Sequence, residues 1–253
     1  MLQGLRTVVA YLKKQEFHKT VSTVFDYLRR QYLFLPFLSY AISAIRRYDA
    51  TNDFDTLVDF SYSFWHGFIK PFQVRYELAE LVKYVNKEKP GVILEIGTAL
   101  GGTLFLFCRA ASENAVLISV DLPLGKWGGG YSRTRIPLYE SFPSTYQHLH
   151  LIRGDSHNRE VLEEVKTILQ GKKVDFLFID GDHSYEGVRK DFDMYSPLVK
   201  INGIIAFHDV IKSIHKECDV CRFWDELASL YEHRTIVEND DQQWAGIGII
   251  VKK

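Results

Sequence analysis

The sequence has 253 residues, of which 46% are hydrophobic and 25% charged, the composition of an ordinary globular protein with a sizeable core. Its 31 lysines and arginines against 32 acidic residues leave a formal net charge of −1. We therefore expect no nucleic-acid partner, because binding to nucleic acid usually shows as a basic excess. Three cysteines do not make a disulfide framework and fit a reducing compartment. The apolar stretch after Met1 is too short for a signal peptide, so we expect a cytoplasmic protein.

Residues 1–72 differ from the rest of the chain and are expected to form a helical N-terminal extension. They are rich in Tyr, Phe, Leu and Arg and poor in Gly. The apolar run Tyr32–Ile45 contains Pro36 and is shorter than the ~20 residues that a membrane-spanning helix needs, so we predict no transmembrane segment. Three roles remain open: a cap on the main domain or on the partner subunit of a homo-oligomer, a lid over the substrate, and a helix in peripheral contact with a membrane.

The main domain is expected over residues 73–253, and a buried strand followed by a glycine turn organises it. The apolar run Val92–Ile96 predicts a strand buried on both faces. The turn Gly97–Gly102 lets the backbone approach a ligand, and an apolar helix follows from Thr103. Such a unit opens a nucleotide-binding fold. Because Ala99 stands at the second glycine of the pattern Gly-x-Gly-x-x-Gly, a pyrophosphate site is poorly supported.

Strands and helices alternate along this domain. Apolar periodicity predicts helices over 75–86, 160–171, 185–195 and 222–231, and further strands over 116–120, 149–153, 174–180, 203–207, 234–237 and 246–251. This order predicts a Rossmann-like α/β fold, with a doubly wound, mostly parallel seven-stranded sheet and helices on both faces. Only residues 238–245 separate the last two strands, too few for a parallel crossover, so the C-terminal strand should be antiparallel.

Polar residues gather where the strands end. An open α/β sheet binds its ligand outside the carboxyl ends of its strands, so we expect these side chains to share one rim. Asp121 is placed to accept hydrogen bonds from the hydroxyls of a ribose. Asp155 is placed to border an adenine, or alternatively to cap the next helix. The residues at the predicted rim are Glu95, Asp121, Asp155, Asp180, Asp182, His183, His208 and Asp209.

Two of these acids favour a metal ion. Asp180 and Asp209 end neighbouring strands of the expected sheet, and with His208 they form an oxygen-rich set that suits Mg²⁺, or Mn²⁺ if the histidine takes part. His183 lies three residues past Asp180, near enough to act as a general base. Alternatively, His183 only packs against or caps the following helix.

Zinc is a weaker alternative at another place in the chain. Cys218 and Cys221 follow His215 closely. These residues supply at most three local ligands, and no second cysteine pair follows.

A long connection follows Asp121. It carries Trp127, Tyr131, Arg133 and Arg135 around the glycines at positions 128–130. Long structured loops in compact domains are often functional. We interpret this loop either as an active-site flap whose four side chains grip the substrate or as a surface insertion.

The segments 175–191 and 203–210 resemble class I S-adenosylmethionine-dependent methyltransferases, in the family of cephalosporin hydroxylase-like proteins and macrolide and sugar O-methyltransferases. They are more distantly similar to catechol O-methyltransferase, and the resemblance covers about residues 75–251. It implies metal ligands at Asp180 and Asp209, whereas His208 replaces an acid of the catechol enzyme's metal site. It also implies catalytic roles for Asp180 and for His183, which stands where the catechol enzyme has a basic lysine. It implies S-adenosyl-L-methionine as the cofactor, held by Glu95, Gly97, Thr98, Gly101, Gly102, Asp121, Asp155, Ser156 and Asp180.

The function we predict is therefore transfer of a methyl group to a small hydroxylated acceptor, such as a sugar or a secondary metabolite, with help from a divalent metal. One rival is a nicotinamide-dependent dehydrogenase, which Asp121 permits and Ala99 disfavours. The other rival is a binding or assembly protein that keeps the cofactor pocket without turnover. An intact set of Asp180, His183 and Asp209 argues against that rival.

Overall fold

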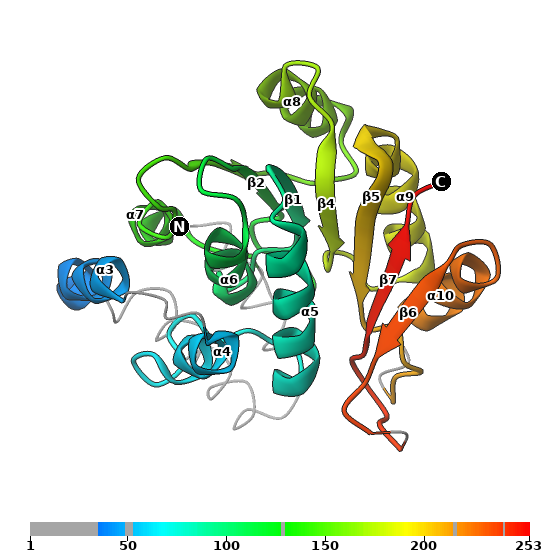
Figure 1. Ribbon diagram of the computed structural model, residues 1–253, viewed down its shortest axis with the longest axis horizontal. Coiled ribbons are helices and arrows are strands. Elements are labelled where there is room, and N and C mark those ends of the chain that lie inside the picture. The colour runs from blue at the N-terminus through cyan, green and yellow to red at the C-terminus, as the bar shows by residue number, and fades with distance from the viewer. Residues whose placement is uncertain (1–34, 49–52, 128–129, 215–216, 240) are drawn as a thin grey trace, which may run out of the picture.

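The sheet of the protein has the predicted architecture. The computed structural model describes residues 35–48, 53–127, 130–214, 217–239 and 241–253, and it contains a seven-stranded sheet in the order β3-β2-β1-β4-β5-β7-β6 (Figure 1). Strands β1 to β5 pair in parallel, and β7 pairs antiparallel with both β5 and β6. The strands are β1 (Val92–Ile96), β2 (Val116–Asp121), β3 (His148–Arg153), β4 (Val174–Ile179), β5 (Val199–His208), β6 (His233–Ile236) and β7 (Ile247–Val251).

Helices cover both faces of this sheet, as predicted. Two hydrophobic clusters, one on each face, join the helices to the strands. The first face carries α3 (Leu38–Arg47), α4 (Phe54–Ser63), α5 (Arg75–Glu88), α6 (Gly102–Ala110) and α7 (Ile136–Tyr139). The second face carries α8 (Arg159–Leu169), α9 (Tyr185–Tyr195) and α10 (Val220–Ala228). Short 3₁₀ helices form at Leu35–Phe37, Arg133–Arg135 and Ser196–Leu198.

Strand β1 lies at the centre of the sheet, between β2 and β4. All five of its residues are buried, because helices pack on both of its faces. Ile93 belongs to one hydrophobic cluster and Leu94 to the other, which is the alternation that a strand imposes on its side chains. The carboxyl end of β1 therefore opens beside the ends of both neighbouring strands.

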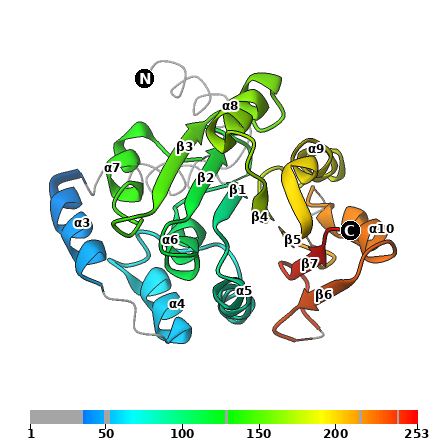
Figure 2. The same cartoon turned by 45° about the horizontal axis from the view of Figure 1, so that its top comes forward.

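Part of the predicted extension packs on the first face. Figure 2 shows α3 beside α7 and α4 beside α5 and α6, and these helix pairs are in contact. Ala41, Ile45, Leu57 and Val58 are buried in the same hydrophobic cluster as α5 and α6. Residues 1–34 lie outside the described part of the chain, and the division at residue 72 stays a prediction. Among the described residues, no helix is both long enough and apolar enough to span a membrane.

Two glycines allow close contacts that position the site. Gly97 has a φ of +96°, and a Cβ atom there would lie 2.0 Å from the carbonyl oxygen of Asp180, so the end of β1 can lie against the end of β4. At Gly102, a Cβ atom would lie 2.3 Å from the carbonyl oxygen of Ile69. Only glycine leaves room for these approaches, which join β1 to β4 and the start of α6 to the segment before α5.

Candidate active site

A cavity of about 280 Å³ opens at the carboxyl ends of β1, β2, β3 and β4. It lies where an open α/β sheet binds its ligand. Five of the nine residues predicted to hold the cofactor line it, namely Gly97, Asp121, Asp155, Ser156 and Asp180. We call this space the strand-end cavity.

Asp121 joins the wall of this cavity to the glycine turn. Its Oδ2 accepts a hydrogen bond from the backbone N–H of Ala99 at 2.7 Å. Burial raises the pKa of Asp121 to about 6, although the backbone donors of the turn, led by Ala99, favour the ionised form. Ala99 has a φ of +45°, a left-handed conformation uncommon outside glycine. The turn therefore forms without the second glycine of the dinucleotide pattern.

The other four residues predicted to hold the cofactor do not line the strand-end cavity. Glu95 is fully buried, and its two carboxylate oxygens accept hydrogen bonds from the hydroxyls of Thr103 and Ser119. Burial raises the pKa of Glu95 to about 8. The hydroxyl of Thr98 pairs with that of Ser119. In this structure Glu95 and Thr98 hold the base of the glycine turn from inside the protein.

Gly101 and Gly102 do not line the strand-end cavity. A Cβ atom on Gly101 would lie 2.7 Å from the ring of Tyr139, and one on Gly102 would meet Ile69, so both glycines allow close packing around the start of α6. Their contact with the cofactor stays a prediction.

The loop after β2 differs from the predicted flap. Tyr131 and Arg135 were expected to grip the substrate, but their exposed fractions are 2% and 0%. The guanidinium of Arg135 donates to the carbonyls of Phe68 and Leu100 and to the hydroxyl of Tyr139. Since these groups already hold its charge in the interior, Arg135 is unable to pair with a substrate anion in this arrangement. Its role here is to fasten the loop to the first face of the molecule.

The two remaining loop residues are accessible. Arg133 is exposed. The indole Nε1 of Trp127 donates to Asp182 at 3.1 Å, and its ring stacks on His183 with centroids 4.9 Å apart. Trp127 therefore reaches the rim, whereas residues 128 and 129 lie outside the described part of the chain.

The acids and histidines at the ends of β4 and β5 form one compact cluster. His183 Nδ1 lies 2.5 Å from Asp209 Oδ2, and His183 Nε2 lies 3.5 Å from Asp180 Oδ1. His208 Nδ1 lies 3.1 Å from the same oxygen of Asp180. Asp209 has a φ of +60°, which is uncommon for aspartate and is found more often near functional sites. We call Asp180, His183, His208 and Asp209 the rim cluster.

Opposite charges inside the rim cluster change its proton affinities. Burial opposes the charge on His183, but the hydrogen bond to Asp209, the contact with Cys218 and the charge of Asp180 raise the pKa of His183 to about 11. Burial likewise opposes the charge on His208, but Asp180 and Asp209 raise the pKa of His208 to about 8. For Asp209, burial is outweighed by His208 and His183, which hold its pKa well below the usual range. In this arrangement the imidazoles are cationic near neutral pH and balance the carboxylates.

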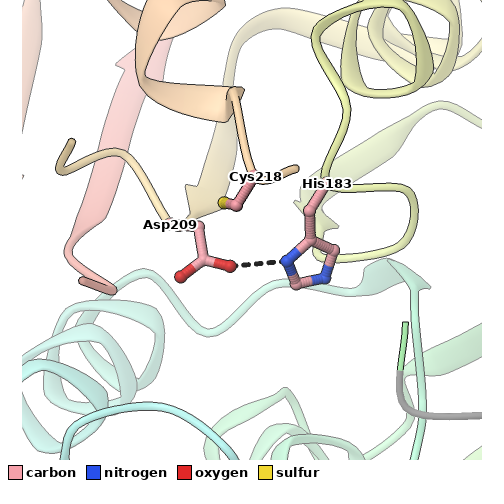
Figure 3. A group of neighbouring side chains, drawn as sticks. All are labelled: His183, Asp209 and Cys218. Atoms are coloured by element: carbon pink, nitrogen blue, oxygen red, sulfur yellow. Dashed lines mark hydrogen bonds and ion pairs between the residues drawn. The ribbon is translucent and has the colours of Figure 1, made fainter. Parts of the chain in front are cut away.

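Two overlapping sets of side chains have the spacing of metal ligands. The ligand atoms of Asp180, His208 and Asp209 lie within 4.8 Å of one another. Two carboxylates and one imidazole fit the predicted Mg²⁺ or Mn²⁺ site. His183, Asp209 and Cys218 form the second set, also within 4.8 Å (Figure 3).

Of the two cysteines considered for zinc, only Cys218 is part of a possible ligand set among the described residues. Cys218 lies beside Asp209 in Figure 3, and its Sγ is within 4.8 Å of ligand atoms of Asp209 and His183, so it adjoins the rim cluster. Cys221 is not part of either ligand set among the described residues, and His215 lies outside them. The pair of cysteines thus does not form a common site in the described part of the chain.

Sequence reasoning missed two buried polar residues near the rim cluster. Gln73 Nε2 donates to Asp180 Oδ2 at 2.6 Å, and no pattern in the sequence marked it. Glu77 is fully buried on α5 and accepts hydrogen bonds from the side chain of Gln242 and the backbone N–H of Gly246. The sequence did contain a signal for Glu77: it lies next to the apolar positions 78, 81, 82 and 85 of the predicted helix, which indicates that it is buried.

A larger cavity of about 1170 Å³ is linked to the rim cluster through Gln73. Its walls come from residues between 62 and 75, from Leu100, and from residues 238, 239 and 241–244 between β6 and β7. Trp65, Phe72 and Trp244 expose their rings in it. Gln73, which holds Asp180, is part of its wall. We call this space the aromatic cavity.

Comparison with known proteins gives the family of the central region. Residues 94–210 match the family model described as a methyltransferase domain. The chain is 30% identical over 114 residues to a ribosomal RNA large subunit methyltransferase E of a Janthinobacterium species, an alignment that covers 45% of this chain and 48% of that protein. The chain spans less than two thirds of the length of the curated relatives it matches.

Solved structures share the fold. The O-methyltransferase TomG of Streptomyces achromogenes, solved with SAM, gives a TM-score of 0.53 at 15% identity and covers 85% of this chain and 96% of its own. An O-methyltransferase of Bacillus cereus, solved with SAH, gives 0.50 at 15% identity and covers 91% and 97%. The predicted Rossmann-like fold and the predicted resemblance to class I methyltransferases are confirmed by these matches together with the sheet order.

Proposed function

We propose that the protein transfers the methyl group of S-adenosyl-L-methionine to a hydroxyl oxygen of a small acceptor. The match of residues 94–210 to a methyltransferase domain and the shared fold support this proposal. The observation that carries this proposal is a hydrogen bond between the walls of the two cavities. The strand-end cavity has Asp180 in its wall, and the aromatic cavity has Gln73, which is hydrogen-bonded to Asp180. A cofactor in the first and an acceptor in the second would meet at the rim cluster.

The strand-end cavity suits the cofactor. Asp121 is the acid placed for the ribose hydroxyls, and Asp155 and Ser156 line the side expected for the adenine. Asp180 would lie near the methionine portion, and Gly97 leaves space for it. Glu95 and Thr98 support this site by holding the glycine turn rather than by contact with the ligand.

A divalent metal fits the chemistry of the rim cluster. Asp180, His208 and Asp209 would hold it, and when bound, Mg²⁺ or Mn²⁺ supplies Lewis acidity that lowers the pKa of the acceptor hydroxyl and orients it. His183 is oriented by Asp209 on one side and by the ring of Trp127 on another. The carboxylates of Asp180 and Asp209 keep His183 protonated near neutral pH. His183 would take the proton of the acceptor hydroxyl in the neutral form that it adopts when a bound cation offsets those charges.

The aromatic cavity is our candidate for the acceptor site. Exposed aromatic rings pack well against the face of a sugar or another ring, and Gln73 in the wall of this cavity is hydrogen-bonded to Asp180 of the rim cluster. We assign the acceptor site to this cavity and no longer to Tyr131 and Arg135 of the loop after β2, because both are buried. Trp127 and Arg133 remain available to the acceptor or to the cofactor.

Calorimetry and a labelled-methyl assay test the proposal together. We expect binding of S-adenosylmethionine and S-adenosylhomocysteine, no binding of NAD, and methyl transfer to a hydroxylated compound that falls with EDTA and returns with Mg²⁺ or Mn²⁺. Binding of NAD alone would favour the dehydrogenase. Cofactor binding without transfer to any member of a broad panel of sugars, nucleotide sugars and phenols would favour the non-catalytic protein. Full activity in chelator would remove the metal from the mechanism.

A further inference from the structure

Gln73 lies at the junction of the two cavities. It lines the aromatic cavity, and its Nε2 donates to Oδ2 of Asp180, a residue in the wall of the strand-end cavity. The exposed fraction of Gln73 is 5%, so its hydrogen bond to Asp180 is shielded from water. A polar contact in such surroundings is stronger than on an open surface.

The backbone that carries Gln73 is fixed from two sides. The hydroxyl of Tyr62, at the end of α4, donates to the carbonyl of Gln73 at 2.6 Å. A few residues earlier, Ile69 and Pro71 pack against Gly102, where no side chain larger than hydrogen fits. Helix α5 begins two residues after Gln73. The backbone of Gln73 is therefore held in place before any ligand binds, which a residue that orients others requires.

Gln73 divides the two oxygens of Asp180 between different partners. Oδ2 receives the amide N–H of Gln73, whereas Oδ1 lies 3.1 Å from His208 Nδ1 and 3.5 Å from His183 Nε2. Without the donor on Oδ2, only the two imidazoles on Oδ1 would orient the carboxylate. The hydrogen bond thus keeps Oδ1 directed at the rim cluster.

The other end of the amide has no partner. Gln73 Oε1 is buried and accepts no hydrogen bond from the described residues. Buried amide oxygens in folded proteins nearly always have a partner. Since Gln73 lines the aromatic cavity, a donor on a bound molecule is the group that would complete it after a small shift of the side chain.

We propose that Gln73 is the positioning residue of the reaction, with its N–H aligning Asp180 and its Oε1 accepting a hydrogen bond from the acceptor. This inference rests on the proposed function. It further implies that the acceptor carries a hydrogen-bond donor close to the hydroxyl that is methylated. Substitution of a residue that orients a metal ligand typically lowers metal affinity or activity by about 10- to 100-fold.

The test replaces the amide by a chain of similar length without polar atoms. Gln73→Met removes both hydrogen-bonding groups, and Gln243→Met is the matched control, because Gln243 is an exposed amide in the wall of the same cavity. Binding of Mn²⁺ to the full chain, followed by electron paramagnetic resonance, should weaken by about 10- to 100-fold in Gln73→Met. It should change by less than about two-fold in the control. Equal Mn²⁺ affinity in Gln73→Met and the wild type would overturn the proposal.

A second measurement separates this inference from the proposed function. The imidazole NMR signals of His183 and His208 report the orientation of Asp180 without any metal, cofactor or acceptor. Gln73→Met should shift the His208 signals while Gln243→Met leaves them in place, even if the wild type proves to bind no Mn²⁺ and to transfer no methyl group. Unshifted His208 signals would show that Gln73 does not orient Asp180. With an acceptor found by the labelled-methyl assay, Gln73→Met should both lower kcat and raise KM, and a change in neither would remove its contact with the acceptor.

Discussion

Two groups of acids lie at the same edge of the sheet and are held in opposite ways. Glu95 and Asp121, on β1 and β2, are surrounded by neutral donors, namely hydroxyls and backbone N–H groups, and burial raises the pKa of each. Asp180 and Asp209, at the ends of β4 and β5, face two imidazoles, and these lower the pKa of Asp209. The difference shows that the partners of a carboxyl group, more than its depth, decide whether it is ready to bind a cation.

The largest effect on activity is expected from a substitution in the acid group that faces the imidazoles. Asp209→Asn removes the partner of His183 and a candidate metal donor while keeping the shape of the side chain. We expect kcat to fall by about 10²- to 10⁴-fold, the range for losing general acid–base catalysis. The pKa of His183, followed by NMR, should fall as well. Normal turnover of this variant would remove Asp209 from the reaction.

Among the acids with neutral partners, Asp121→Ala should lower the affinity for the cofactor and leave the methyl-transfer step itself unaffected. Loss of hydrogen bonds between this carboxylate and a ribose should reduce the affinity for S-adenosylhomocysteine by about 1.5–3 kcal/mol, measured by calorimetry. Asp209→Asn serves as the comparison, because its affinity for S-adenosylhomocysteine should stay close to that of the wild type. Unchanged binding in Asp121→Ala would take Asp121 out of the ribose role.

The smallest effect concerns stability and Glu95. Its pKa is about 8 in the folded chain against an ordinary value of 4.5, so the folded chain keeps a proton that the unfolded chain releases. This contribution to stability is complete below about pH 4.5 and is lost as the pH rises toward about 8. Glu95→Gln lacks this proton equilibrium. Its free energy of unfolding, relative to the wild type, should therefore rise by about 1–3 kcal/mol between about pH 5 and about pH 9 in urea titrations. Parallel pH profiles of the two proteins would contradict the raised pKa.

The sequence allowed the sheet and its functional rim to be predicted for a physical reason. Strands and helices carry their periodicity locally, and the ends of parallel strands meet at one edge whatever the details of packing. Asp180, His183, His208 and Asp209 were therefore brought together correctly. Their pKa values depend on distances of a few ångströms between side chains, and the periodicity of the sequence gives no such distances.

Side-chain direction was not predictable in the same way. Glu95 and Arg135 are charged residues beside a predicted ligand site, yet the fold buries both and satisfies them internally. Gln73 stands far from Asp180 in the sequence, and their contact requires the packing of residues 62–75 on α6. Tertiary packing sets these contacts.

The seam between the two cavities has a consequence for how such a protein diversifies. The aromatic cavity is built from residues 62–75 and 238–244, whereas the strand-end cavity is built from the ends of β1 to β4. Under the proposed function, substitutions in the first set would change the choice of acceptor while the wall proposed for the cofactor stays unchanged. Gln73 is the exception to this independence, because it lines the aromatic cavity and is hydrogen-bonded to Asp180 in the wall of the strand-end cavity. The proposed arrangement therefore predicts that new acceptor preferences arise by substitution in the outer segments, with Gln73 retained.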